Sequence, residues 1–286
     1  PVLVPPQQER LRMTLLSVVI PAFRHANVLA ETVRSVLDQK GVDLELIIAD
    51  HSSGDGTYEV ARSFESDPRV TVLETPAGGG AIANWAAVTE RARGDYLKLL
   101  PGDDTVLPGS LARQVALLEA HPGASLVGGR RRIIDTKGRT IAKRRGLQGL
   151  DAVMSGGDAV RASVLSGTNP FGEPGAVTMR RSALEAAGGW QGQWSYAIDV
   201  ASYYGVLRHG SFVRDDEVAS TFRVGGGQWS VALVDEQASE MTRLFEWAGS
   251  VFDEVSDADV ARGSAKARSL ARQRRMVYRI LKMVKR

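Results

Sequence analysis

The first third of the chain carries four short runs of apolar residues that recur at regular intervals. The runs are rich in β-branched side chains and end at a proline or a polar residue, which is typical of buried strands. The sequence therefore predicts strands at residues 15–20, 44–49, 70–73 and 96–100.

The segments between these runs have apolar residues at helical spacing. In residues 27–39 the apolar side chains share one face, and Asn27 stands where a helix N-cap is expected. Further helices are predicted at residues 57–64, 81–92, 110–120, 181–187, 199–207 and 231–252. Strands that alternate with helices in this way favour right-handed βαβ units. The predicted fold class is α/β, with an open, mostly parallel sheet flanked by helices.

The second half of the chain has a weaker pattern. Strands are expected near residues 125–128 and 218–223, residues 130–149 are basic and weakly periodic, and residues 153–176 are interpreted as loops. No internal repeat and no long flexible linker separates the two halves, so both are expected on one sheet. The predicted organisation is an N-terminal extension (1–14), a first half (15–108), a second half of the same domain (109–235) and C-terminal helices with a basic tail (236–286).

Composition narrows the class of protein. Of the 286 residues 43% are hydrophobic and 24% charged, which excludes a disordered or collagen-like chain. No apolar run reaches the roughly 18–20 residues of a membrane span, and no secretory signal is expected from the first residues. The absence of cysteine excludes disulfides, thiolate metal sites and cysteine nucleophiles. The four histidines are scattered and form no HExxH cluster.

Positive charge is concentrated in the tail. Residues 261–286 hold ten Lys and Arg and no acid, so residues 1–260 carry −7 although the whole chain carries +3. Its apolar residues Val277, Ile280, Leu281 and Val284 form one narrow helical stripe. The segment is interpreted either as a terminal helix docked on the body or as a helix on an anionic membrane surface or near an anionic lipid-linked substrate. Nucleic acid is less favoured, because Tyr278 is its only aromatic residue.

Acidic residues follow the predicted strands. Asp50 ends the second strand, Asp55 follows in the same turn, and Asp103 and Asp104 follow the fourth strand. In an open parallel sheet, ligands bind outside the carboxyl ends of the strands. Clustered carboxylates repel one another, and Mg²⁺ relieves such repulsion with one or two carboxylates and phosphate oxygens as ligands. We therefore expect either a hard cation or the hydrogen-bond donors of a ligand at this edge.

Two nucleotide-binding motifs are missing. The turn after the first strand, PAFRHAN, has no glycine, so it lacks the GxGxxG fingerprint, and no GxxxxGK[ST] occurs. The glycine triplet at residues 78–80 follows the third strand instead. Phosphates are therefore expected on a metal and side chains.

Four segments nevertheless have the order and spacing of a known family: SVVIPAF, LELIIADHSSGDGT, the Gly-rich turn that reaches Asn84, and GDYLKLLPGDDTVLPGSL. In these segments the chain resembles the family-2 glycosyltransferases with a GT-A fold, strongly over residues 16–111 and onward to residue 230. The tail after about residue 260 lies outside the resemblance. The resemblance implies a nucleotide-sugar-binding half at 15–108 and a half at 109–235 that binds the acceptor and supplies the catalytic base.

The resemblance also implies roles for single residues. Asp50 matches the acid that hydrogen-bonds the nucleotide base, with a turn or cap acid as the alternative. Asp55 is expected either to contact the ligand or to cap the following helix. Asp103 and Asp104 match the metal-binding element, where Mg²⁺ or Mn²⁺ would bridge the donor diphosphate; a surface turn is the alternative. The residues expected at the nucleotide sugar are Pro21, Ala22, Phe23, Arg24, Asp50, Ser53, Asp55, Gly78, Asn84, Gly102, Asp103 and Arg223.

Several positions depart from the family pattern. Pro101 replaces the first acid of the metal-binding element, so metal binding rests on fewer carboxylates. His51 replaces the second acid of the turn after the second strand, and Arg24 stands where the family has Asn and could hold a phosphate. Arg223 matches an element that closes over the donor diphosphate, with Gly225 in place of His; it is interpreted as a diphosphate clamp or as part of a surface salt bridge.

The catalytic base is expected in the second half. By resemblance Asp199, which follows the Gly-Gly-Trp turn at residues 188–190, removes the proton of the acceptor hydroxyl, although Ile198 stands where Glu is common. Partial burial would raise its pKa toward the working range, and the alternative is an acid at a helix N-terminus. The residues expected at the acceptor are Glu173, Trp190, Trp194 and Tyr196, with core packing or a plain loop role as the alternative.

The resulting hypothesis is an inverting, metal-assisted glycosyltransferase of hexosyltransferase type. It would move a sugar from a UDP-, dTDP- or GDP-linked donor to a hydroxyl of a saccharide, glycolipid or small molecule, in polysaccharide or glycoconjugate biosynthesis. We expect a cytoplasmic protein, peripheral at the inner face of the membrane through residues 261–286. One alternative is an impaired nucleotide-sugar binder or partner subunit, motivated by Pro101 and Ile198. The other is a nucleotidyltransferase that makes nucleotide sugars, against which the PAFRHAN turn argues.

Overall fold

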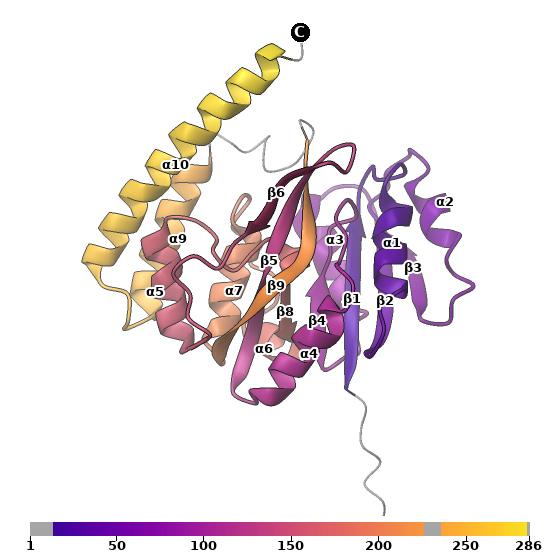
Figure 1. The fold of residues 1–286 in the computed structure, drawn as a ribbon, viewed down its shortest axis with the longest axis horizontal. Helices are drawn as coiled ribbons and strands as arrows, with labels where there is room; N and C mark the ends of the chain where they lie inside the picture. Colours follow the sequence, from indigo (N-terminus) through magenta and orange to yellow (C-terminus); the bar gives the residue numbers. More distant parts are fainter. Residues whose placement is uncertain (1–13, 226–235, 285–286) are drawn as a thin grey trace, which may run out of the picture.

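The computed structural model describes residues 14–225 and 236–284, with side chains as far as residue 275. Its centre is a nine-stranded sheet with helices on both faces (Figure 1). The strands are β1 (Leu15–Ala22), β2 (Asp43–Asp50), β3 (Val70–Glu74), β4 (Tyr96–Leu99), β5 (Ala124–Asp135), β6 (Thr140–Arg145), β7 (Val153–Met154), β8 (Val177–Arg180) and β9 (Ser211–Val224).

The order of the strands joins the two halves of the chain in one sheet. It is β3-β2-β1-β4-β8-β5-β9-β7, and β6 pairs with β5. The first four strands are parallel, as the sequence predicts. β8 lies between β4 and β5 and is antiparallel to both, whereas β5 and β9 are parallel. The sheet is therefore parallel in its first half and mixed in its second half.

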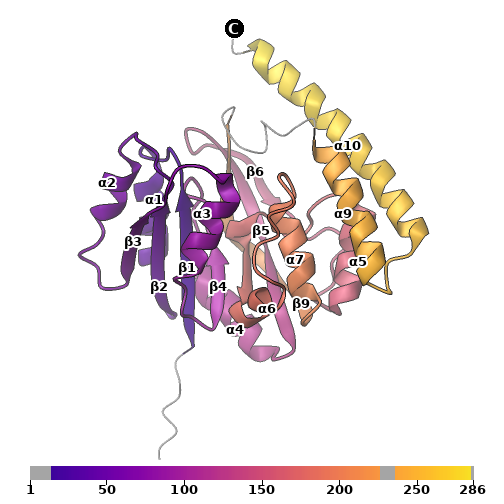
Figure 2. The same cartoon turned by 180° about the vertical axis from the view of Figure 1, so that it is seen from behind.

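The helices form two layers, and each layer has its own hydrophobic core. α1, α2 and α4 cover one face, and α3, α5, α6, α7 and α9 cover the other, as Figure 2 shows from behind. Alternation along β1 illustrates the division, because Val18 and Ile20 pack in the first core and Val19 in the second. The helices are α1 (Leu29–Leu37), α2 (Thr57–Arg62), α3 (Gly80–Thr89), α4 (Ser110–Ala120), α5 (Gly156–Ser166), α6 (Arg181–Ala186), α7 (Ile198–Leu207), α9 (Gln237–Val251) and α10 (Asp257–Val284), with a 3₁₀ turn, η1 (Pro174–Ala176).

Two details of the sequence prediction are wrong. Asn27 does not cap α1: Val28 takes the N-cap position, and no side chain caps the helix. The segment 153–176 is not all loop, because it contains α5. Ser155 caps that helix by accepting a hydrogen bond from the backbone N–H of Asp158 at 3.0 Å. Glycine and serine hid the helical spacing of its buried apolar residues.

The C-terminal helix α10 packs against α5 and α9. Its small residues make close approach possible: a Cβ on Gly263 would lie 2.3 Å from the carbonyl oxygen of Val164 in α5. Ala267 and Ala271 are buried at the same interface. The described part of α10 is thus docked on the body, whereas the apolar stripe from Val277 to Val284 lies outside the described side chains.

In the described part of the chain, no helix has the length and hydropathy needed to cross a membrane.

Candidate active site

The ends of β1, β2 and β4 form one edge of the sheet, because these strands are parallel neighbours. Several of the predicted site residues stand in the turns that follow these strands. The charges that act on His25 indicate that three of these residues lie close together. Burial lowers the pKa of His25, while the negative charges of Asp103, Asp55 and Asp50 oppose that shift. The three acids are therefore close enough to act on one imidazole, as expected for a shared crevice.

Asp50 is fixed by the turn that follows it. Its side chain is buried, Oδ2 accepts a hydrogen bond from the backbone N–H of Ser53 at 3.1 Å, and Oδ1 accepts one from the Ser53 hydroxyl. The Ser53 hydroxyl in turn accepts from the backbone N–H of Arg24 at 2.9 Å. These bonds tie the end of β2 to the turn after β1.

Phe23 and Arg24 face outward from that turn. The Phe23 ring is 47% exposed, and the Arg24 guanidinium lies 5.1 Å from the ring centre. Arg24 has a φ of 57°, which is uncommon for a residue other than glycine. Pro21 and Ala22 are buried within β1 and contribute backbone and packing rather than exposed side chains. An exposed aromatic ring beside a guanidinium offers a surface for a planar base or a phosphate.

Asn84, Gly78 and Asp55 support the same edge. The Asn84 amide donates to the carbonyls of Ala22 and Ala49, each at 3.3 Å, and so joins the ends of β1 and β2. Gly78 is exposed and has a φ of 101°, so it provides the left-handed turn that leads into α3. The Asp55 carboxylate accepts from the backbone N–H of Thr57 at 3.0 Å, at the start of α2. That contact favours the capping interpretation of Asp55.

Asp103 and Asp104 face different surroundings. Asp103 is half-buried, whereas Asp104 is 1% exposed and accepts a hydrogen bond from the backbone N–H of Arg223 at 2.7 Å. Burial and the neighbouring charge of Asp103 raise the pKa of Asp104 well above its usual range. The Arg223 guanidinium is also buried; it donates to the Asp103 carbonyl at 2.8 Å and pairs with Glu31 at 2.9 Å. These partners favour the ion-pair interpretation of Arg223, whose side chain is buried although that of Glu31 is exposed.

The metal prediction depends mainly on Asp103. No group of three or more His, Cys, Asp or Glu side chains that could hold a metal ion occurs among the residues that the structure describes. A cation that bridges a diphosphate needs only one or two protein carboxylates, since phosphate oxygens complete its shell. Gly102 places the buried Nδ1 of His25 next to this turn: a Cβ on Gly102 would lie 2.5 Å from that nitrogen, which has no hydrogen-bond partner in the described part. Asp103 supplies one carboxylate of the kind that Mg²⁺ or Mn²⁺ on a diphosphate takes as a ligand.

Asp199 lies in the first turn of α7, in the second half of the chain. Burial, and after it the charge of Glu173, raises the pKa of Asp199 to about 7. The Asn169 amide holds this carboxylate: Nδ2 donates to Oδ2 of Asp199 at 3.0 Å and to the carbonyl of Gly172 at 2.8 Å. A carboxylate with a pKa near neutrality and a fixed orientation is suited to accept a proton.

Glu173 connects the two groups of acids. Its negative charge contributes to the raised pKa of Asp199 and to that of Asp104, after burial in each case. It forms an ion pair with Arg131 of β5, whose Nη2 donates to Oε1 of Glu173 at 3.0 Å. The pair holds the Glu173 carboxylate against the Arg131 guanidinium.

The three aromatic residues predicted at the acceptor differ in accessibility. Trp190 and Trp194 are each only 8% exposed. Trp190 packs edge-to-face on Trp85 and donates its indole N–H to the Thr89 hydroxyl at 2.8 Å. This geometry favours core packing for both tryptophans. Tyr196 is half-buried, and its hydroxyl accepts a hydrogen bond from Arg274 of α10 at 3.0 Å.

Sequence reasoning gave no role to four residues that shape this site. These residues are His25, Arg131, Asn169 and Glu240. The buried Glu240 carboxylate of α9 accepts backbone N–H bonds from Ser195, Tyr196 and Ala197 and thereby fixes the loop before Asp199. His25 follows PAFR in the turn after the first strand, and that position could have indicated it. Nothing in the sequence near Glu240 or Arg131 indicates their partners, which are 43 and 42 residues or more away.

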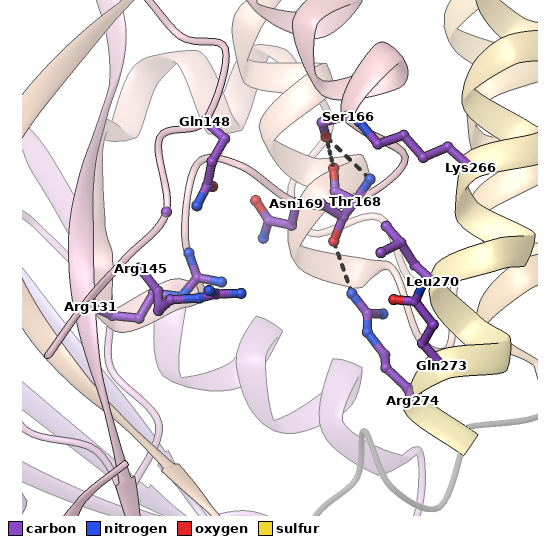
Figure 3. A pocket seen from close by; sticks show the side chains of 11 residues that line it. Arg131, Arg145, Gln148, Ser166, Thr168, Asn169, Lys266, Leu270, Gln273 and Arg274 are labelled. Carbon is purple, nitrogen blue, oxygen red and sulfur yellow. Dashed lines mark hydrogen bonds between the residues drawn. The ribbon is translucent and has the colours of Figure 1, made fainter. Parts of the chain in front are cut away.

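A cavity of about 550 Å³ lies beside Asp199 (Figure 3). In the close-up, Arg131 and Arg145 extend into it from one side and α10 forms the opposite wall, with Thr168 and Asn169 between them. Asn169 is the residue that holds Asp199, so the cavity is separated from the candidate base by one side chain.

The open, mostly parallel sheet flanked by helices has the architecture of a GT-A type glycosyltransferase, a fold that solved structures share with this chain. The family model for "Glycosyl transferase family 2" matches residues 17–188, and the chain belongs to that family.

Comparisons with individual proteins agree with this assignment. EpsE of Bacillus subtilis (strain 168) is 29% identical over 178 residues, which are 62% of this chain and 60% of EpsE. The S. aureus TarS 1–349 structure in complex with UDP-GlcNAc superposes with a TM-score of 0.67 at 14% identity, over 88% of this chain and 71% of that one. The mannosyltransferase PcManGT from Pyrobaculum calidifontis, in complex with GDP-Man and Mn²⁺, gives a TM-score of 0.61 at 16% identity, over 90% and 75%.

Proposed function

We propose that this protein transfers a sugar from a nucleotide-diphosphate sugar to an acceptor hydroxyl with inversion at the anomeric carbon. The observation that carries the proposal is Asp199, a half-buried carboxylate with a pKa raised to about 7 that Asn169 holds beside a cavity. Two solved structures of the same fold are complexes with UDP-GlcNAc and GDP-Man, which supports a nucleotide sugar as the donor.

In the proposed mechanism the donor lies on the edge formed by β1, β2 and β4. Asp50 accepts from the base, and Phe23 and Arg24 border the nucleotide. The acceptor hydroxyl gives its proton to Asp199 as its oxygen bonds to the anomeric carbon. The bond from that carbon to the diphosphate breaks in the same displacement, and the nucleoside diphosphate leaves. Inversion follows from attack on the face opposite the leaving group.

The leaving diphosphate carries the charge that must be stabilised. A bound Mg²⁺ or Mn²⁺ would neutralise it electrostatically, and we expect the Asp103 carboxylate, in the turn after β4, to hold the cation. A solved structure of this fold contains Mn²⁺, which supports a divalent cation here. Asp104 and Arg223 act on the turn: their backbone bond and the Arg223 contact with the Asp103 carbonyl keep Asp103 in place.

The test of the base is Asp199→Asn, which keeps the size of the side chain and removes its ability to accept a proton. We expect transfer to fall roughly 100-fold or more, while donor binding stays unchanged. Asp257→Asn is the matched control, since Asp257 is an exposed acid in the first turn of α10. Transfer by Asp199→Asn at the rate of the control would exclude Asp199 as the base.

The product separates this function from the two alternatives. Release of nucleoside diphosphate supports glycosyl transfer, and release of pyrophosphate supports a nucleotidyltransferase. Binding of the donor without turnover supports a nucleotide-sugar binder. A cytoplasmic enzyme that contacts the inner membrane face through residues 261–286 stays a prediction.

A further inference from the structure

The cavity beside Asp199 is strongly basic. Its described lining contains Arg131, Arg145, Lys266 and Arg274 and no acid. Arg131 is neutralised by Glu173, but no acidic partner is found in the described residues for the other three. Arg274 donates to the hydroxyls of Tyr196 and Thr168, each at 3.0 Å, which are neutral groups. Three positively charged side chains thus line one hollow, and within residues 14–225 and 236–275 none of them is paired with an acid; Lys266 donates to the Leu165 carbonyl at 3.4 Å.

The lining residues contact three groups of the candidate acceptor site. Asn169 donates to Asp199, Arg131 pairs with Glu173, and Arg274 donates to Tyr196. Anything bound in the cavity therefore lies one side chain from the candidate base. The loop of Glu173 adjoins the same wall, because Asn169 also donates to the carbonyl of Gly172 at 2.8 Å.

We propose that this cavity binds a phosphate group of the acceptor and so presents an acceptor hydroxyl to Asp199. The inference rests on the function proposed above. Arg145 and Arg274 offer planar donor groups and Lys266 a compact ammonium, a combination that matches phosphate oxygens. A phosphate ester carries up to two negative charges and so balances the three cations better than a single carboxylate does. The volume of about 550 Å³ is large enough to hold a phosphorylated sugar unit.

The α10 helix supplies one wall of this phosphate site. Lys266, Leu270, Gln273 and Arg274 all belong to it, and it lies beyond the residues that match the family model. α10 is held on α5 through Gly263, so the distance across the cavity is fixed by packing rather than by a loop. The site is therefore formed before the acceptor arrives.

The test compares two double variants that remove the same charge. Arg145→Gln with Lys266→Gln changes the cavity, and both side chains are exposed, so the fold is expected to persist. Arg268→Gln with Arg272→Gln is the control, because both arginines are exposed on α10 and neither lines the cavity. Circular dichroism and thermal melts would verify that both double variants are folded.

The probes are glucose 6-phosphate, glucuronate and glucose, with binding measured by calorimetry at low salt. We expect the cavity variant to weaken binding of glucose 6-phosphate roughly 10-fold or more and the control to change it less than about twofold. Equal weakening in both variants would mean attraction to general surface charge and would overturn the proposal. If glucuronate binds as tightly as glucose 6-phosphate, the assignment to phosphate is wrong. If neither compound binds, the cavity is not an anion site.

Phosphate can reach the cavity on a lipid or on a free saccharide, and vesicles distinguish these sources. Phosphatidylcholine vesicles with and without phosphatidic acid serve as the probe. Binding that requires phosphatidic acid and is lost in the cavity variant, but not in the control, assigns the phosphate to a lipid. Equal behaviour of both variants on vesicles, together with the loss of glucose 6-phosphate binding in the cavity variant, assigns it to a free saccharide.

Release of nucleoside diphosphate from the donor, measured over a panel of saccharide, glycolipid and sugar-phosphate acceptors, separates this inference from the proposed function. If the donor is never cleaved but glucose 6-phosphate binding depends on Arg145 and Lys266, the anion site stands and glycosyl transfer fails. If the donor is cleaved and glucose 6-phosphate binding is the same in both double variants, the phosphate site fails and glycosyl transfer stands.

Discussion

Two opposing effects act on the negative charge of Asp199. Its burial makes the negative charge costly, and the Asn169 amide together with the N-terminal backbone of α7 reduces that cost. The outcome is a pKa raised from 3.8 to about 7. The folded state therefore binds this proton more tightly than the unfolded state does. Stability from this group is present at low pH and is lost as pH rises toward 7.

The first prediction concerns stability. Asp199→Asn removes the buried charge, so the variant should gain free energy of unfolding relative to the parent as pH rises from 4 to 8. We expect a relative gain of at least about 1 kcal/mol, since one pKa unit corresponds to about 1.4 kcal/mol. Urea unfolding at both pH values measures it. A difference that is independent of pH would show that the Asp199 pKa is not raised.

The second prediction concerns the pH dependence of transfer. Asp199 must be ionised to act as a base, so kcat/KM should fall below pH 7. Asn169→Ala removes a hydrogen bond to the ionised form and should move this limb upward by about 0.5–1 unit. Steady-state rates from pH 5 to 9 measure the shift, with Asn27→Ala at an exposed asparagine as the control. If the acidic limb of the kcat/KM profile does not move in Asn169→Ala, Asn169 does not influence the pKa of the base.

At the scale of elements, the contact of α10 with α5 fixes the geometry of the second half. Gly263 allows the two helices to approach until a Cβ would lie 2.3 Å from the Val164 carbonyl. Alanine is normally the better helix residue, by about 1 kcal/mol. At this position the steric cost should exceed that gain, because the obstructing atom belongs to the backbone.

The third prediction follows from that conflict. Gly263→Ala should lower the melting temperature by several degrees and weaken glucose 6-phosphate binding, since α10 must move away from α5. Ser269→Ala, at an exposed position of the same helix, should leave both unchanged. Thermal melts and calorimetry test the pair of variants. A gain in stability from Gly263→Ala would show that the helices can separate without cost.

Elements of the first half could be predicted from periodicity because each has one dominant environment. Buried parallel strands have continuous apolar runs in the sequence, and β1, β2 and β4 lie at such runs, whereas β3, at the edge of the sheet, is only partly buried. The strands of the second half are harder to predict from the sequence. β5 begins with buried residues and continues into basic residues, which pair with the basic strand β6. α5 was missed because Gly156 and Gly157 open it, and glycine is a poor helix residue.

At the scale of the whole molecule, the two halves share one sheet, so donor binding should stabilise the entire fold. The fourth prediction is that UDP or GDP with Mn²⁺ raises the melting temperature. At a ligand concentration of 100 times Kd, binding should add about 2.7 kcal/mol to the free energy of unfolding. Asp103→Asn should remove the part of this shift that depends on Mn²⁺. Asp104→Asn should instead change the melting temperature without ligand, because Asp104 is buried and accepts the Arg223 N–H. Equal effects of both variants would contradict separate roles.

The candidate site could be predicted only as far as its residues lie next to strands. Asp50, Asp103 and Asn84 follow strands, so strand order alone brought them together. Glu240 lies on α9, far along the chain from the loop that it holds, and only the packed fold shows that contact. Trp190 could not be assigned from the sequence for another reason: an aromatic residue near a site is equally suited to pack in the hydrophobic core, where Trp190 lies.

The placement of α10 has a consequence for diversity among relatives. The residues matched by the family model end at 188, whereas one wall of the cavity is built by a helix that starts at Asp257. A chain of this design can exchange its terminal segment and change the molecules that it modifies without rebuilding the strand ends. Chimeras that carry another member's final helix should therefore keep the nucleotide preference of the parent and adopt a different partner for the sugar.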